Sequence, residues 1–189
     1  EHDKAYALTD GMCDVREPVF DKGGKYIYFF ASTDAGPLRH WFAMSNTEMQ
    51  MTSAIYAAAL RKDTPSPLAR ESDEEAGVSD DEKSSEKETD DGEGNNEEGF
   101  SIEFDGLNNR IIALPIEAGN LFSLQVGEEG HVYYLEATST ARGPYAKETQ
   151  LHKYDLAERE DKVIKSGVNS YRISANDKKV LFSSERSWW

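Results

Sequence analysis

The sequence predicts an all-β fold made of repeated four-stranded antiparallel units, and three observations lead to this prediction. A short hairpin pattern occurs three times along the chain. Two further strand patterns follow the second copy before the third begins. The spacing between these two copies is 47 residues, from Val126 to Ile173, which is close to the repeat of a propeller blade. We therefore expect residues 1–189 to form one partial β-propeller domain.

The repeated pattern is an apolar residue, a four-residue turn and a strand in which aromatic and apolar residues alternate. Its three copies read FDKGGKYIYF, VGEEGHVYYL and ISANDKKVLF. The turns end in Gly24, Gly130 and Asp177, which are residue types that tolerate a positive φ. Each copy therefore predicts a tight hairpin, with one face of each strand in a core.

Two more strands complete the blade that starts at Val126. The segments QLHKYDL and KVIKSG each resemble a strand, and the charged turn AERED separates them. The first blade is longer, because 106 residues separate Phe20 from Val126. We attribute the excess to an apolar insertion at 33–51 and an acidic insertion at 71–98. Without these 19 and 28 residues, 59 remain, which is near one blade repeat.

The two ends of the chain are interpreted as pieces of neighbouring blades. Residues 4–12 are predicted to be the last strand of a preceding blade, and residues 178–189 the second strand of an unfinished one. The prediction is therefore two nearly complete blades plus parts of two more. Closed propellers typically contain four to eight blades, so this chain is expected to be a piece of one.

Most of the net charge of −15 comes from the acidic insertion at 71–98. This segment holds 14 acidic residues and two lysines, whereas the rest of the chain has 22 acidic and 19 basic residues. With only Ala76 and Val78 as apolar residues, it is predicted to be disordered. The alternative is a docking segment for a basic partner or for divalent cations. Because phosphate groups would be repelled, we expect no nucleic-acid partner.

The sequence lacks the common motifs of catalysis and cofactor binding. It contains no GxSxG, no HExxH, no paired Cys/His spacing and no glycine-rich phosphate loop. We therefore expect no catalytic, cofactor-binding or metal-binding residue, and we expect the four histidines to be packed or solvated. The single cysteine, Cys13, excludes an intrachain disulfide. No apolar run is long enough to span a membrane, so we expect no membrane partner.

The apolar insertion provides the one candidate contact surface. Leu38, Trp41, Phe42 and Met49 could form the apolar side of a short helix. Methionine and aromatic side chains adapt to varied apolar partners, which would suit contact with a peptide. The other interpretation, which we favour, is that the helix packs on its own blade or on a neighbouring domain.

Two segments carry a resemblance to a known family. LRKDTPSPLARESDEE and RIIALPIEAGN, together with LTDGM near the start and LHKYDL, make the chain similar to tricorn-type proteases, in particular their bacterial homologues. The likeness runs from about Tyr6 to Trp189 and implies a fragment of the second β-propeller. It further implies that the parent is a serine peptidase whose catalytic serine and histidine lie outside this chain. Whether this chain is itself an enzyme is left open.

The resemblance implies a non-catalytic module that gates peptide access to a catalytic region, or product exit from it. The implied partners are the catalytic and PDZ domains of the same polypeptide, unfolded peptides as substrates, and further copies of the parent in a homo-oligomer. No cofactor is implied, and the expected compartment is cytoplasmic, with a periplasmic or secreted location as the alternative. Because fold does not determine function, two other interpretations stay open. They are a protein-binding propeller platform and the propeller of a prolyl-oligopeptidase-type enzyme.

Overall fold

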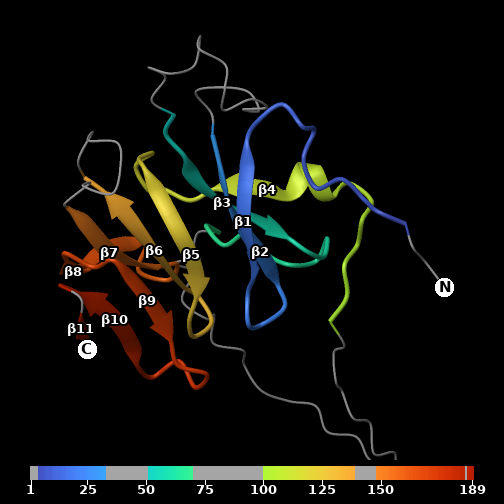
Figure 1. The fold of residues 1–189 in the computed structure, drawn as a ribbon. Helices are drawn as coiled ribbons and strands as arrows, with labels where there is room; N and C mark the ends of the chain where they lie inside the picture. Colours follow the sequence, from blue (N-terminus) through green and yellow to red (C-terminus); the bar gives the residue numbers. More distant parts are fainter. Residues whose placement is uncertain (1–3, 33–50, 70–99, 139–147, 186) are drawn as a thin grey trace, which may run out of the picture.

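The strands in the described part of the chain form three successive antiparallel sheets (Figure 1). The computed structural model describes residues 4–32, 51–69, 100–138, 148–185 and 187–189. The first sheet contains β1 (Val15–Phe20), β2 (Tyr26–Ala31), β3 (Ala54–Ala59) and β4 (Ile111–Ala113), with the 3-10 helix η2 (Leu107–Arg110) directly before β4. The second contains β5 (Leu121–Val126), β6 (His131–Ala137), β7 (Thr149–Asp155) and β8 (Glu160–Ser166). The third contains β9 (Ser170–Ile173), β10 (Val180–Ser184) and β11 (Ser187–Trp188).

Each strand pairs with the next one along the chain, so every sheet is a meander. The first strands of the sheets lie beside one another, because β1 contacts β5 and β5 contacts β9. This is the arrangement of propeller blades whose first strands are innermost. The predicted fold class, a partial β-propeller of antiparallel blades, is therefore confirmed.

The three predicted hairpins are present, and their turns share one backbone feature. Gly24, Gly130 and Asp177 have φ angles of 67°, 84° and 58°. Each is the fourth residue after the end of the first strand of its hairpin, and the turns lie on one side of the molecule (Figure 1). The left-handed conformation suits glycine and is tolerated by aspartate, which explains why only these types occur there.

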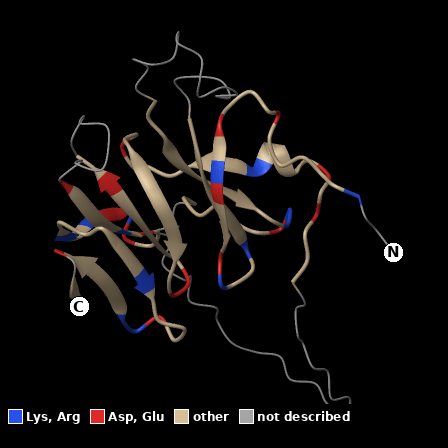
Figure 2. Ribbon diagram, in the orientation of Figure 1, with Lys and Arg blue, Asp and Glu red and all other residues tan. Residues whose placement is uncertain are grey.

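Alternation along β2 and β6, the second strands of the first two blades, builds the core on both faces of their sheets. In β6, Val132 and Tyr134 pack toward the first sheet, whereas Tyr133 and Leu135 pack toward the third. Successive side chains of a strand point to opposite faces of its sheet. A sheet that is covered on both faces therefore needs apolar residues at consecutive positions of the strand, not only at alternate ones. Charged residues lie mainly at the turns and on β8, and the first strands β1 and β9 carry some as well (Figure 2). The apolar contacts between sheets therefore hold the blades together.

Two details at the ends of the chain differ from the prediction. Residues 4–12 form no strand, because no described strand offers them a hydrogen-bonded ladder. They pack through side chains instead: Tyr6 stacks on Phe104 with ring centroids 4.0 Å apart, and Leu8 packs on the outer face of the first sheet. At the other end β11 adds a third strand where only a second was expected. Of the two predicted insertions, only Met51 is among the described residues.

Candidate functional site

The residues predicted for peptide or domain contact, Leu38, Trp41, Phe42 and Met49, lie outside the described residues. Two other surfaces are built by described residues. One is the row of first strands, and the other is the end of the blades where the three hairpin turns meet.

A β-bulge interrupts β1 and β5 at the same point. The pairing register shifts after Arg16 in β1 and after Phe122 in β5. The residue that follows each shift, Glu17 or Ser123, has a positive φ of 53° or 59°. A bulge leaves backbone groups without ladder partners, and a left-handed residue other than glycine is strained. Both features therefore need support from outside the strand.

At the β5 bulge, the blades on both sides supply that support. The Leu124 amide, within the β5 bulge, donates to Glu17 Oε2 at 2.9 Å. The Tyr171 hydroxyl of β9 donates to the Ser123 carbonyl at 2.5 Å. Tyr171 is almost fully buried, and burial raises the pKa of its hydroxyl, which therefore stays a donor. The first strands are thus joined by a polar seam that crosses from blade to blade.

Ion pairs join the hairpin turns of different blades. Lys22 of the first turn pairs with Asp177 of the third. Lys25 Nζ of the first turn lies 2.6 Å from Glu129 Oε1 of the second. Exposed pairs of this kind contribute roughly 0–1 kcal/mol each, so their main effect is on the relative position of the turns.

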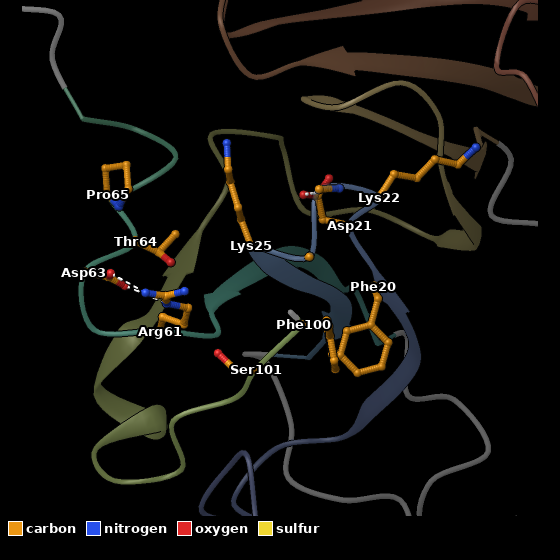
Figure 3. A pocket seen from close by; sticks show the side chains of 12 residues that line it. Phe20, Asp21, Lys22, Lys25, Arg61, Asp63, Thr64, Pro65, Phe100 and Ser101 are labelled. Carbon is orange, nitrogen blue, oxygen red and sulfur yellow. Dashed lines mark hydrogen bonds and ion pairs between the residues drawn. The ribbon is translucent and has the colours of Figure 1, made fainter. Parts of the chain in front are cut away.

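The first hollow at this end has a volume of about 680 Å³ and lies beside the first turn (Figure 3). The rings of Phe20 and Phe100 meet edge to face on one side, with centroids 5.4 Å apart. On the other side Arg61 donates to both carboxylate oxygens of Asp63, at 3.0 and 2.7 Å. These hydrogen bonds lower the pKa of Asp63. The hollow therefore combines exposed aromatic surface with a charge pair.

The second hollow, of about 480 Å³, lies between the turns of the first and second blades. Residues 65–69, which follow β3, form one of its sides. The Tyr26 hydroxyl holds this segment through the Pro65 carbonyl at 2.7 Å. Arg159, from the β7–β8 turn, donates to the carbonyls of Leu68 and Ala69 at 3.1 and 2.6 Å. The second hollow is thus bounded by parts of both blades.

Two polar groups of the second hollow are deeply buried. Asp21 is 6% exposed, and its Oδ2 accepts the Gly23 amide at 3.1 Å. Burial raises the pKa of Asp21, an effect that the amides of the turn oppose and the charge of Glu129 increases. Tyr28 is 1% exposed, and its hydroxyl has no hydrogen-bond partner in the structure. A buried hydroxyl without a partner is destabilising, so this position requires an explanation.

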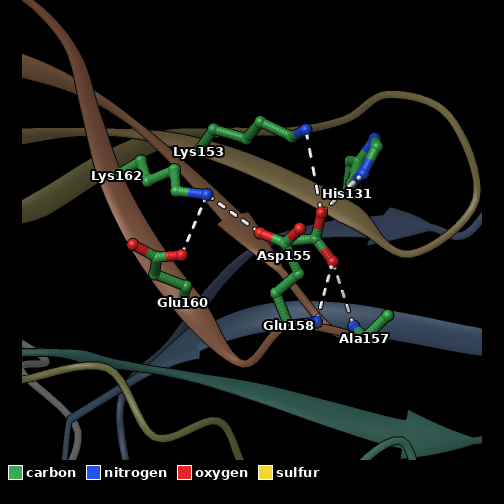
Figure 4. A network of polar contacts seen from close by, with 7 residues as sticks. All are labelled: His131, Lys153, Asp155, Ala157, Glu158, Glu160 and Lys162. Carbon is green, nitrogen blue, oxygen red and sulfur yellow. Dashed lines mark hydrogen bonds and ion pairs between the residues drawn. The ribbon is translucent and has the colours of Figure 1, made fainter.

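Asp155 closes the turn between β7 and β8 (Figure 4). Its Oδ1 accepts the amides of Ala157 and Glu158 at 3.0 and 3.2 Å, and its Oδ2 lies 3.0 Å from His131 Nε2. Burial acts to raise the pKa of Asp155, but the Glu158 amide and His131 together outweigh it, and the pKa is lowered. His131 therefore belongs to a network that shapes a turn.

His152 is buried in the second sheet between two carboxylates. Its Nδ1 lies 2.8 Å from Asp161 Oδ2 and its Nε2 lies 3.3 Å from Glu136 Oε2, while the Tyr134 ring stacks on it. Among the described residues no serine hydroxyl bonds to either described histidine.

The described part of the chain also contains no group of three or more His, Cys, Asp or Glu placed to hold a metal ion. No helix within it is long and apolar enough to cross a membrane.

Comparison with known proteins gives a likeness in structure. No protein-family model and no curated protein matches the sequence. A crystal structure of the tricorn protease is similar over 95% of this chain, with a TM-score of 0.58 and 18% identity. The shared feature is the fold. This chain spans 16% of the length of that tricorn protease chain.

A second solved structure, the β-propeller domain of the Trilobed protease from Pyrococcus furiosus, matches 92% of this chain and 35% of its own. Its TM-score is 0.43 at 9% identity.

The sequence did not point to the residues of the second hollow. Tyr28 was predicted only as one of the alternating aromatic residues of a strand. Its hydroxyl is buried without a partner because of the way the first two blades pack together, which the sequence does not reveal. Asp21 carried a weak signal, because aspartate two residues before a glycine often accepts that residue's amide in a turn. The bulges at Glu17 and Ser123 carried none, since neither residue type favours a positive φ.

Proposed function

We propose that this chain is a propeller module of a tricorn-like serine peptidase. It takes no part in bond cleavage and forms a section of the wall that peptides pass on the way to, or from, a catalytic region elsewhere in the polypeptide. The partners in this proposal are the catalytic and PDZ domains of the parent and its unfolded peptide substrates.

The similarity to the tricorn protease carries the proposal, because it extends over 95% of the chain rather than over one blade. The segments LRKDTPSPLARESDEE and RIIALPIEAGN carry the resemblance from which the same proposal arises at the level of sequence. His152 also fits a non-catalytic role, because both of its ring nitrogens face carboxylates and neither is left to act as a base toward a hydroxyl.

The polar seam between the first strands suits a passage wall. Because Glu17 and Tyr171 bond to the backbone of the neighbouring blade, they fix the spacing of the first strands. A passage selects peptides by width only if its walls keep that spacing. The proposal therefore assigns peptide selection to the row formed by β1, β5 and β9.

The chain alone should not hydrolyse peptides. We expect no cleavage of casein by the purified chain, followed by mass spectrometry, and no labelling by a fluorophosphonate that reacts with activated serines. Chymotrypsin serves as the positive control for both measurements. Cleavage that the fluorophosphonate abolishes would contradict the proposal.

A further inference from the structure

The second hollow has the chemistry of a binding site that the proposed function does not use. It lies between two complete blades, and its volume of about 480 Å³ is within the range of small-ligand sites, about 300–1,000 Å³. It contains one buried carboxylate, from Asp21, and one buried hydroxyl without a partner, from Tyr28. Both groups favour a ligand that brings hydrogen-bond donors.

The charges of the second hollow favour a cationic ligand at the Asp21 side. Among the residues that the structure describes, no cationic side chain donates a hydrogen bond to Asp21, which accepts an amide of its own turn. The basic residues of the second hollow are already engaged: Lys25 pairs with Glu129 at 2.6 Å, and Arg159 donates to two carbonyls. Asp21 is therefore a buried carboxylate to which no described cationic side chain is hydrogen-bonded, and the nearby Lys25 ammonium, which pairs with Glu129, acts on it only through space.

The aromatic residues of the second hollow favour the same ligand. The rings of Tyr26 and Tyr28 lie side by side, with centroids 6.2 Å apart and planes tilted by 42°. Tyrosine faces attract ammonium and guanidinium groups. The Tyr28 oxygen has free lone pairs, so its hydroxyl can accept a hydrogen bond from an N–H group.

We infer that the second hollow binds a primary ammonium group, held by the Asp21 carboxylate and the Tyr28 oxygen and flanked by tyrosine rings. A lysine side chain and the amino end of a peptide both supply this group. This inference does not depend on the proposed function. Amine binding and the peptidase role can each fail without the other.

Butylammonium is the probe, and calorimetric titration of the whole chain is the measurement. We expect saturable binding with a dissociation constant on the order of 1 mM, and no binding of the neutral analogue butanol. Nα-acetyl-lysine amide and glycine amide then distinguish the two natural sources of the ammonium group. Binding of either compound supports the inference.

Three variants test the residues that hold the group. Asp21→Asn keeps an oxygen that accepts the Gly23 amide but removes the charge, and should weaken binding about ten-fold or more. Tyr28→Phe removes a hydroxyl that has no protein partner, so the chain should fold normally while binding weakens several-fold. Lys25→Met removes a competing ammonium and should tighten binding.

Asp63→Asn, in the first hollow, is the matched control and should leave the affinity unchanged. Absence of saturable butylammonium binding would overturn the inference. Equal binding of butanol, or affinities that Asp21→Asn and Tyr28→Phe leave unchanged in folded protein, would also overturn it.

Discussion

Asp21 has two opposing effects on stability, and the sequence alone does not show both. Its carboxylate caps the first hairpin turn by accepting the Gly23 amide, and its burial places a negative charge between two blades. The first role stabilises the folded state, and the second destabilises it unless a cation is near. The balance between them can be measured through the dependence of stability on pH.

The free energy of unfolding should depend on pH through Asp21. Because its pKa is raised above the ordinary value of 3.8, the folded state binds more protons than the unfolded state between these two pKa values. Stability from this group is therefore lost as the pH rises from 3.8 through the raised pKa. We expect Asp21→Asn to gain in melting temperature relative to the unmodified chain as the pH rises from 3.8 through the raised pKa of Asp21.

Asp63 provides a control, because its pKa is shifted in the opposite direction to that of Asp21. Its pKa is lowered by hydrogen bonds from Arg61, so its contribution is lost as the pH falls through the lowered pKa. Asp63→Asn should therefore approach the unmodified chain in stability as the pH falls. A melting-temperature difference for Asp21→Asn that is independent of pH, or that reverses, would contradict the account of Asp21.

At the scale of elements, the hairpin is the unit that repeats. The left-handed positions Gly24, Gly130 and Asp177 show that the three copies share backbone geometry as well as residue pattern. Residue types at such positions are restricted by steric contacts of Cβ, which is why the sequence alone located all three turns. Pro18, exposed beside the β1 bulge, has no N–H to offer and so helps protect the edge of β1.

Gly130 allows the backbone strain of the turn to be tested without a packing change. A Cβ added there would meet no atom within 4 Å, whereas one added at Gly24 would lie 3.3 Å from Phe100. We expect Gly130→Ala to lower the free energy of unfolding in urea by about 1–2 kcal/mol, and Gly130→Asn to lower it less. If Gly130→Ala proved as stable as the unmodified chain, the turn would not require a left-handed residue.

The sequence predicted the strands but not the β-bulges within them. Alternation in EPVF and LFSLQV predicted strands, and strands are present, but the register shifts at Glu17 and Ser123 are not visible in that alternation. They depend on hydrogen bonds from residues about 50 to 100 positions away, such as Tyr171 and Leu124. Local pattern therefore located the elements, while contacts between blades determined their irregularities.

For the whole molecule, the repeat spacing was sufficient to predict sheets in sequence order. It worked because each blade is a meander, in which neighbours in sequence are neighbours in space. The strand predicted for residues 4–12 is absent, because a segment with a strand-like sequence does not form a strand without a neighbouring strand to pair with. The two hollows were not predictable either. The first lies between the β1–β2 turn and the segments that follow β3 and precede η2, and the second lies where turns of two blades meet.

The proposed role belongs to the row of first strands as a whole. Peptide selection by a passage depends on the width of the passage. A bulky side chain in the wall should therefore slow the entry of long peptides and leave the entry of short ones unchanged. Pro18→Trp places an indole at the exposed bulge of β1. Lys162→Trp, on the exposed outer strand β8, adds the same group away from the row and is the matched control.

The most direct test is the ratio of cleavage rates for a long unstructured peptide and a short chromogenic peptide, measured in the proposed full-length peptidase. Pro18→Trp should lower this ratio several-fold, with the short peptide cleaved at the unmodified rate, and Lys162→Trp should leave the ratio unchanged. A ratio that Pro18→Trp does not change, in a variant with an unaltered melting temperature, would contradict the proposal that this propeller segment forms a selective wall.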